Sequence, residues 1–254
     1  MFDGHCHLDK KIGDVDKAMN FLFGEAKKVG VHGMILLNVP EIDYDNDKVL
    51  DCARKFSKFF YIFPSINPLS ENVFDQIKKF KKTGAAGIKM HPRMQSYALD
   101  SKNCVDLLKT AGHHDLPVLI DCFPAGDNIV MNNLPPVFGK LAREAKGTKI
   151  AIGHSGGHHI LDALMISKFY KNVYLDLSYT LLYYRDSHIL DDIFYVLKSS
   201  KYERIFWGTD YPDRSYSETV RMTMDEFNKM DIVEENKKML LEKNALDFLG
   251  LYGY

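Results

Sequence analysis

Cysteine is scarce in this sequence, with four residues among 254, and no two of them form a CxxC pair. Cysteines this few and this scattered exclude the dense disulfide framework of small secreted domains and a structural zinc site of the CxxC type. We therefore expect buried free thiols at all four positions, which are Cys6, Cys52, Cys104 and Cys122.

Charge of one sign is not in excess either, because 33 Lys and Arg residues stand against 34 Asp and Glu residues and the formal net charge is -1. A chain without a basic excess lacks the electrostatic attraction that holds a phosphate backbone or an anionic membrane. We expect a small-molecule substrate as the partner, with no nucleic acid and no membrane.

Long hydrophobic runs are also absent, since no apolar segment approaches the roughly 18 residues of a membrane span. The first residues, MFDGHCHLDKK, lack the basic and apolar regions that mark a signal peptide. Together these two absences predict a cytoplasmic protein.

Short apolar segments, in contrast, recur along the whole chain. With 254 residues, 46% of them hydrophobic, the chain can bury one large core, so we expect a single domain over residues 1–254. Eight segments have the length and composition of buried strands. They are MFDGHC (1–6), GMILLNV (33–39), FFYIFPSI (59–66), GIKMH (87–91), PVLIDCF (117–123), KIAIGH (149–154), NVYLDLS (172–178) and RIFWGTD (204–210).

Segments with helical periodicity lie between these strands, among them 16–30, 71–84 and 186–200. Eight alternating strand and helix units predict an α/β fold in which a parallel sheet closes into a (β/α)8 barrel. An open doubly wound sheet is the alternative, but no glycine-rich phosphate loop follows the first strand. The final helix, over 233–249, is expected to close the floor or flank of the barrel.

Polar side chains follow several of the predicted strands at their C-terminal ends, where a barrel builds its active site. His5 and His7 alternate along the first strand, so both point to the same side and can bind one metal ion. A carboxylate such as Asp210 can complete a site that keeps one position open for water. The other strand-end residues of this kind are His91, Asp121 and His154.

Six motifs give the chain a resemblance to a known family. DGHCHLD, GIKMHP, LPVLI, IAIGHSGG, NVYLDLS and RIFWGTDYP occur in this order and cover nearly the whole chain. The set resembles the amidohydrolase superfamily, and most of all its amidohydrolase-2 branch, which includes aminocarboxymuconate semialdehyde decarboxylase and related metal-dependent hydrolases.

The resemblance implies a role for each matching residue. His5 and His7 would be metal ligands, Asp210 would be both a ligand and the group that transfers protons, and His154 would bind the metal or act on the substrate. We expect one divalent ion, in the first place zinc, with manganese or magnesium as alternatives.

The fifth strand departs from the branch pattern, because Asp121 stands in PVLIDCF where the branch has a histidine. An aspartate can bind a metal through oxygen, which favours harder ions such as manganese or magnesium. Asp121 is therefore expected to be either a ligand or a partner of a nearby loop.

The fourth strand and the loop after it supply three residues that we expect to contact the substrate. Lys89 is at the position where some amidohydrolases carry a carboxylated lysine between two metals, but without the histidine of strand 5 we expect one metal and an ion pair for Lys89. His91 shares its face and is expected near the substrate. Arg93, in the loop that follows, could hold a substrate carboxylate by two hydrogen bonds.

These residues predict hydrolysis of an amide, ester or lactone by a metal-activated water, whose pKa falls to about 7. Asp210 would take the proton, and His154 would stabilise charge on the attacked carbonyl. Three alternatives stay open: decarboxylation of an unsaturated or aromatic acid, a TatD-type nuclease, and a degenerate barrel that binds without catalysis. A homodimer is left open as the assembly.

Overall fold

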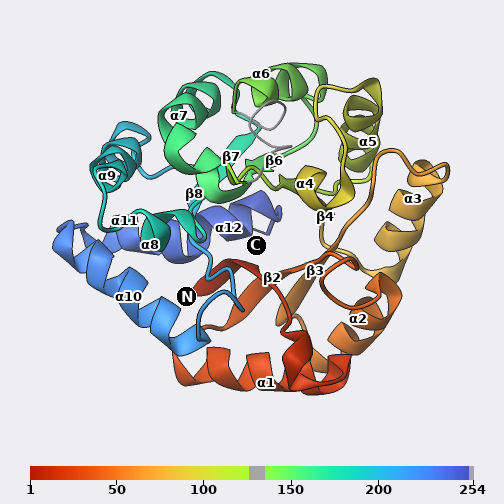
Figure 1. Ribbon diagram of the computed structural model, residues 1–254, viewed down its shortest axis with the longest axis horizontal. Coiled ribbons are helices and arrows are strands. Elements are labelled where there is room, and N and C mark those ends of the chain that lie inside the picture. Colours follow the sequence, from red (N-terminus) through yellow and green to blue (C-terminus); the bar gives the residue numbers. More distant parts are fainter. Residues whose placement is uncertain (126–134, 252–254) are drawn as a thin grey trace.

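The computed structural model describes residues 1–125 and 135–251 of the chain. Its strands stand at the centre and its helices form a ring around them, which is the arrangement of a TIM barrel (Figure 1). The strands are β1 (Phe2–Cys6), β2 (Gly33–Asn38), β3 (Phe60–Pro64), β4 (Ile88–Met90), β5 (Val118–Ile120), β6 (Ile150–Ile152), β7 (Val173–Asp176) and β8 (Ile205–Phe206). Each lies within one of the eight predicted segments, so the predicted α/β barrel is confirmed.

The helices of the ring come from the segments between the strands. They are α1 (Val15–Lys28), α2 (Asn46–Ala53), α3 (Val73–Thr83), α4 (Pro92–Gln95), α5 (Lys102–His113), α6 (Pro135–Glu144), α7 (Ile160–Phe169), α8 (Thr180–Tyr183), α9 (Ile189–Ser199), α10 (Tyr216–Lys229), α11 (Glu234–Lys238) and α12 (Asn244–Phe248). Shorter 3-10 turns are η1 (Lys10–Ile12), η2 (Arg54–Phe56) and η3 (Gly153–His159), and η4 (Met239–Lys243) is a π-helix.

The strands are parallel and follow one another around the barrel, in the orders β1-β2-β3 and β4-β5-β6-β7-β8. A bridge between Ser65 and Lys89 joins β3 to β4. On the other side, Gly4 N donates to the carbonyl oxygen of Trp207 at 2.9 Å, which brings β1 against the end of β8. These two contacts close the circle of strands.

The floor of the barrel is filled by aromatic side chains from the strands and from α12. Phe248 stacks on Phe206 with 5.4 Å between ring centroids, and it also packs against Tyr174 at 5.1 Å and Phe63 at 6.0 Å. The predicted final helix therefore closes the floor. It consists of α11, η4 and α12 in direct succession, so its helical pitch changes at the π-helical segment.

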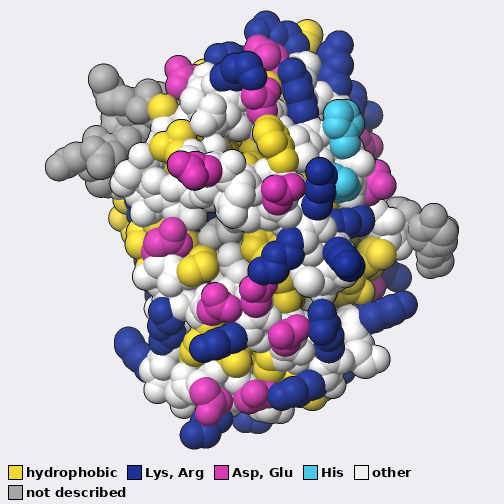
Figure 2. Space-filling model, turned by 90° about the vertical axis from the view of Figure 1, so that its right-hand side faces the viewer, with side chains coloured by type: hydrophobic (Ala, Val, Ile, Leu, Met, Phe, Trp, Pro, Cys, Tyr) yellow, Lys and Arg dark blue, Asp and Glu magenta, His cyan; other side chains and the backbone are white. Residues whose placement is uncertain are grey.

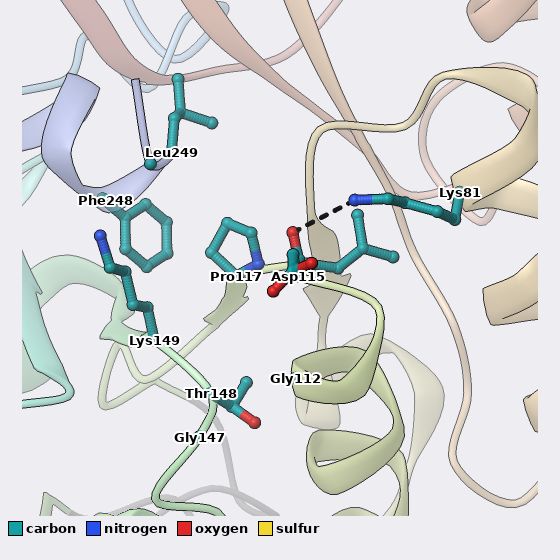
Figure 3. Close-up of a pocket in the computed structure, with 11 residues that line it drawn as sticks. Lys81, Gly112, Asp115, Pro117, Gly147, Thr148, Lys149, Phe248 and Leu249 are labelled. Atoms are coloured by element: carbon teal, nitrogen blue, oxygen red, sulfur yellow. Dashed lines mark hydrogen bonds between the residues drawn. The ribbon is translucent and has the colours of Figure 1, made fainter. Parts of the chain in front are cut away.

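A cavity of about 430 Å³ lies at this end of the barrel, beside the residues that precede β5 and β6 (Figure 3). Lys81 Nζ donates there to the backbone oxygen of Asp115 at 3.5 Å, and Lys149 Nζ lies 3.4 Å from a carboxylate oxygen of Asp247. These lysines already have partners within the chain. Since TIM-barrel enzymes act at the C-terminal ends of their strands, we place the candidate site at the opposite end.

Other expectations from composition can be compared with the structure. All four cysteines are buried, as predicted. Within residues 1–125 and 135–251, none of the helices has the length and apolar composition that a membrane crossing requires. On the face shown in Figure 2, basic and acidic side chains are interspersed, so neither sign forms a continuous surface there.

Candidate metal centre

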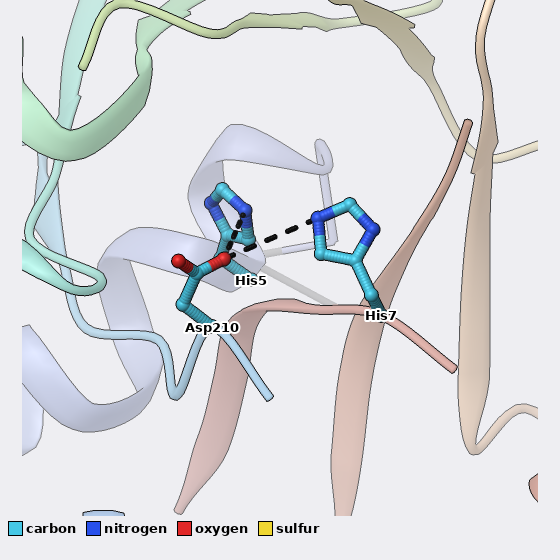
Figure 4. A group of neighbouring side chains, drawn as sticks. All are labelled: His5, His7 and Asp210. Carbon is cyan, nitrogen blue, oxygen red and sulfur yellow. Dashed lines mark ion pairs between the residues drawn. The ribbon is translucent and has the colours of Figure 1, made fainter. Parts of the chain in front are cut away.

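His5, His7 and Asp210 come together at the C-terminal ends of β1 and β8 (Figure 4). Nε2 of His5 lies 3.1 Å from Oδ1 of Asp210, and Nε2 of His7 lies 4.0 Å from the same oxygen. Glycine at position 208 permits this approach, because a Cβ there would lie 2.6 Å from Cβ of His5. The three residues predicted as ligands therefore form one cluster.

The other ring nitrogen of each histidine faces a carboxylate. Nδ1 of His5 lies 2.6 Å from Oδ2 of Asp176, and Nδ1 of His7 lies 3.0 Å from Oδ2 of Asp43. Because a carboxylate accepts hydrogen bonds, both rings carry a proton on Nδ1, and Nε2 is the nitrogen left for a ligand. Histidines that bind metals are held in this way.

The Nε2 atom of His5 gives a direct test of whether a metal suits this cluster. The atom is buried, and although it lies 3.1 Å from Oδ1 of Asp210, its geometry gives no hydrogen bond to that oxygen or to any other atom in the part of the chain that the structure describes. A buried nitrogen without a partner is costly in a native protein. Two imidazoles and a carboxylate are a donor set that binds zinc and similar divalent ions, so the residues fit such an ion.

Charges within the cluster shift its titrations strongly. Burial lowers the pKa of His5, but the carboxylates of Asp176 and Asp210 outweigh that effect and raise the pKa to about 9. Burial favours the neutral form of Asp210, yet the neighbouring imidazoles of His5 and His154 hold the pKa of Asp210 well below its usual range. The site thus favours positive charge beside its carboxylates, and a metal ion supplies such charge.

His154 lies beside His5 on η3, the turn that follows β6, with 4.9 Å between the ring centroids. Its Nδ1 is 3.1 Å from the carbonyl oxygen of Ser178, and its Nε2 is 3.3 Å from Oδ1 of Asp121. His5, His154 and Asp176 form a second cluster of potential ligands. The two clusters share His5 and could hold a divalent ion in two ways.

Asp176 already makes several hydrogen bonds within this second cluster. Its Oδ2 accepts from His154 N at 3.2 Å and from Ser178 Oγ at 2.9 Å, besides contacting Nδ1 of His5. An oxygen with three partners is better suited to orienting His5 than to binding an ion. We therefore favour the cluster of His5, His7 and Asp210 as the metal centre.

Asp121 lies at the end of β5 and is 1% exposed. Its Oδ2 is 3.7 Å from Nδ1 of His91 and 3.7 Å from Nε of Arg93, and the carboxylate belongs to neither cluster of potential ligands. The charges around Asp121 hold its pKa well below the usual range despite burial, which alone would raise it. Direct ligation by Asp121 stays a prediction.

The remaining predicted residues line a cavity of about 380 Å³ that opens over the metal centre. Lys89 is 1% exposed inside the barrel, and burial lowers its pKa although Asp121 opposes that effect. Burial also lowers the pKa of His91, to about 3, so this side chain is neutral at physiological pH. The cavity lining includes Lys89, His91, Arg93, Asp121, His154 and Asp210.

Sequence reasoning did not identify the carboxylates that support the histidines. Asp176 lies in the predicted strand segment NVYLDLS, and its position at the strand's C-terminal end could have indicated a site residue. Asp43 lies in the loop after β2, where no motif marks it.

Sequence reasoning also gave no indication of a role for Asp3. Its side chain links β1, which carries His5, to the segment after β8, which carries Asp210. One carboxylate oxygen accepts from His5 N and Thr209 N, both at 3.0 Å. The other accepts from Thr209 Oγ1 at 2.7 Å and from Tyr216 Oη at 3.0 Å. Burial raises the pKa of Asp3 to about 6, although these hydrogen bonds act in the opposite direction.

Comparisons with known proteins give a family for the sequence and related solved structures for the fold. The sequence model of a family described as amidohydrolase matches residues 39–251, a region that begins after His5 and His7 and includes His154 and Asp210. No curated protein sequence matches the chain significantly.

Solved structures match over nearly the whole chain. An uncharacterised TIM-barrel protein from Bordetella bronchiseptica has a TM-score of 0.83 at 16% identity, covering 100% of this chain and 99% of that one. A probable 2-pyrone-4,6-dicarboxylic acid hydrolase from Acinetobacter baumannii, with citric acid bound, has a TM-score of 0.73 at 13% identity, covering 98% of both chains. A 5-carboxyvanillate decarboxylase from Novosphingobium aromaticivorans, complexed with manganese and a nitrobenzoic acid, has a TM-score of 0.66 at 17% identity, covering 94% and 80%.

Proposed function

The chain belongs to the amidohydrolase family, and on that premise we propose that it is a metal-dependent hydrolase of a small-molecule amide, ester or lactone. The observation that carries the proposal is the buried Nε2 of His5, which lacks a hydrogen-bond partner among the described residues and lies beside His7 and Asp210. This cluster adjoins a cavity large enough for a small molecule.

His5, His7 and Asp210 would hold the ion, with Asp176 and Asp43 fixing the two imidazoles. A divalent ion in this place supplies Lewis acidity and lowers the pKa of water toward neutrality. Zinc suits two imidazoles and one carboxylate, and manganese is the metal in the structurally similar decarboxylase.

Side chains of the protein itself would supply proton transfer and the stabilisation of negative charge. Asp210 is ionised, and its side chain is 18% exposed, so it can accept a proton from water and return it to the leaving group. His154 and Lys89 line the same cavity and can stabilise negative charge that develops on the carbonyl oxygen. The exposed side chains of Lys10, Lys11 and Ile42 also line the cavity.

Non-oxidative decarboxylation is the second candidate, and the decarboxylase among the similar structures favours it. Such a reaction needs a cation to hold the substrate carboxylate, and Lys89 and Arg93 both line the cavity. A nuclease would need a basic surface, which the chain's charge balance does not favour. The cluster of His5, His7 and Asp210 speaks against a degenerate barrel that binds without catalysis.

One assay separates the two reactions. Protein loaded with zinc or with manganese is offered a panel of lactones, esters and amides while acid release is followed, and a panel of aromatic acids while carbon dioxide is measured. We expect acid release that disappears after treatment with a chelator. Carbon dioxide production without any acid release would overturn the hydrolase and establish the decarboxylase.

A further inference from the structure

The carboxylate of Asp121 has an oxygen that nothing in the described chain satisfies. Oδ2 is buried and accepts no hydrogen bond from residues 1–125 or 135–251. Nδ1 of His91, 3.7 Å away, cannot donate to it, because that nitrogen already accepts from Met94 N at 3.4 Å. Two acceptors therefore face each other, and a hydrogen-bond donor is missing between them.

Beside this oxygen, Arg93 has a hydrogen-bond donor that lacks an acceptor among the described residues. Its Nε–H is buried without an acceptor in the described chain, and it lies 3.7 Å from Oδ2 of Asp121, which is too long for a hydrogen bond. Both side chains line the cavity over the metal centre. Unsatisfied buried groups are costly, and here a donor and an acceptor are left open toward one space.

We propose that Asp121 and Arg93 form a binding subsite for an uncharged substrate group that both donates and accepts a hydrogen bond, namely a hydroxyl or a carboxamide. An oxygen about 2.8 Å from each side chain can bridge the two, donating to Oδ2 and accepting from Nε–H. This inference rests on the proposed hydrolase and specifies its substrate class, a hydroxylated or amide-bearing ester, lactone or amide.

A substrate carboxylate does not fit this subsite. It would place negative charge beside the ionised carboxylate of Asp121 and the lone pair of His91 Nδ1, and like charges in a buried site are strongly disfavoured. Arg93 thus has a different use from the carboxylate clamp that its position in the sequence predicts. A family histidine at position 121 would lack this repulsion, so the aspartate sets the selectivity of this chain.

Two lactones that differ in one group test the subsite. In 5-(hydroxymethyl)oxolan-2-one the ring carries a neutral hydroxymethyl group, and in 5-oxooxolane-2-carboxylate it carries a carboxylate at the same position. Binding of each to zinc-loaded protein is measured by ligand-observed NMR. We expect the hydroxymethyl lactone to bind at least about tenfold more tightly, and Asp121→Asn to reduce that ratio about tenfold or reverse it.

Asp213→Asn is the matched control, since it removes the same charge from the cavity lining without changing the subsite, and it should keep the parental ratio. Tighter binding of the carboxylate by the parent, failure of the hydroxymethyl lactone to bind, or an unchanged ratio in folded Asp121→Asn would overturn the proposal. Zinc content is measured on every sample. Absence of zinc would count against the metal-dependent hydrolase, whereas an unchanged ratio in zinc-loaded protein counts against the subsite alone.

Discussion

His5 is the residue on which the candidate metal centre depends, because its two ring nitrogens have different tasks. Nδ1 contacts Asp176 at 2.6 Å, while Nε2 lies 3.1 Å from Asp210 and is the nitrogen that would bind the proposed ion. A carboxylate behind a histidine fixes the tautomer and makes the other nitrogen a better ligand. Asp176 therefore orients His5, and Asp210 is left to hold the proposed ion and to transfer protons.

Replacing Asp210 with Asn keeps the size of the side chain and removes its negative charge. We expect kcat/KM to fall by about 10²–10⁴-fold, the usual range for the loss of a general acid–base group. The variant should still fold, although its stability toward urea should fall, because the lowered pKa of Asp210 means that the ionised carboxylate stabilises the folded state. Kinetics at saturating zinc and unfolding followed by circular dichroism check both parts, and near-parental activity would contradict the role of Asp210.

At the scale of single residues, the sequence predicts the three proposed ligands but not the carboxylates that orient the two histidines. The HxH spacing and the GTDYP turn predict His5, His7 and Asp210, because strand alternation and strand ends are visible in a sequence. Asp43 follows no local pattern, and Asp176 is marked only by its place at a strand end. Which histidine each carboxylate contacts depends on which side chains meet across the barrel. That Oδ2 of Asp121 and Nε of Arg93 lack hydrogen-bond partners among the described residues is likewise visible only in the three-dimensional structure.

At the scale of elements, the decisive feature is the seam between β1 and β8. Asp3 accepts hydrogen bonds from His5 N on β1 and from Thr209 N in the segment after β8, next to Asp210. Asp210 N also donates to the carbonyl oxygen of His5 at 2.8 Å. The distance between the two proposed ligands is therefore set by the backbone, and Asp3 is a positioning residue.

Removing this carboxylate in Asp3→Ala should loosen the metal centre. We expect zinc affinity to fall about 10–100-fold, as for other groups that orient ligands, and the free energy of unfolding to fall by about 3 kcal/mol or more, because several buried donors lose their acceptor. Tyr216→Phe removes one hydrogen bond to Asp3 and is the control. It should lose about 1 kcal/mol and keep its zinc affinity. Unchanged zinc affinity in Asp3→Ala would refute the positioning role.

At the scale of the whole molecule, the barrel separates stability from chemistry. Aromatic side chains around Phe248 fill the floor, and polar side chains gather at the opposite end. The apolar runs of the sequence predict all eight strands, and the last helical pattern predicts the closing helix. The π-helical segment and the stacking of Phe248 on Phe206 follow from tertiary packing, which residue patterns do not encode.

Phe248→Ala tests this separation. The side chain is fully buried, so we expect the free energy of unfolding to fall by about 3–5 kcal/mol, with zinc content and turnover of the folded protein unchanged. Phe169→Ala makes the same substitution at a side chain that is 77% exposed and should have little effect. Loss of zinc from folded Phe248→Ala would show that packing of the barrel floor affects the metal centre, which would contradict the separation.

Metal analysis tests the central claim most directly. Protein purified without chelator and its double variant His5→Ala/His7→Ala are measured by mass spectrometry for metal content, with folding verified by circular dichroism. We expect about one divalent ion per parental chain, in the first place zinc, and almost none in the folded double variant. Undiminished metal in that variant, or none in the parent after incubation with zinc and manganese, would contradict the account.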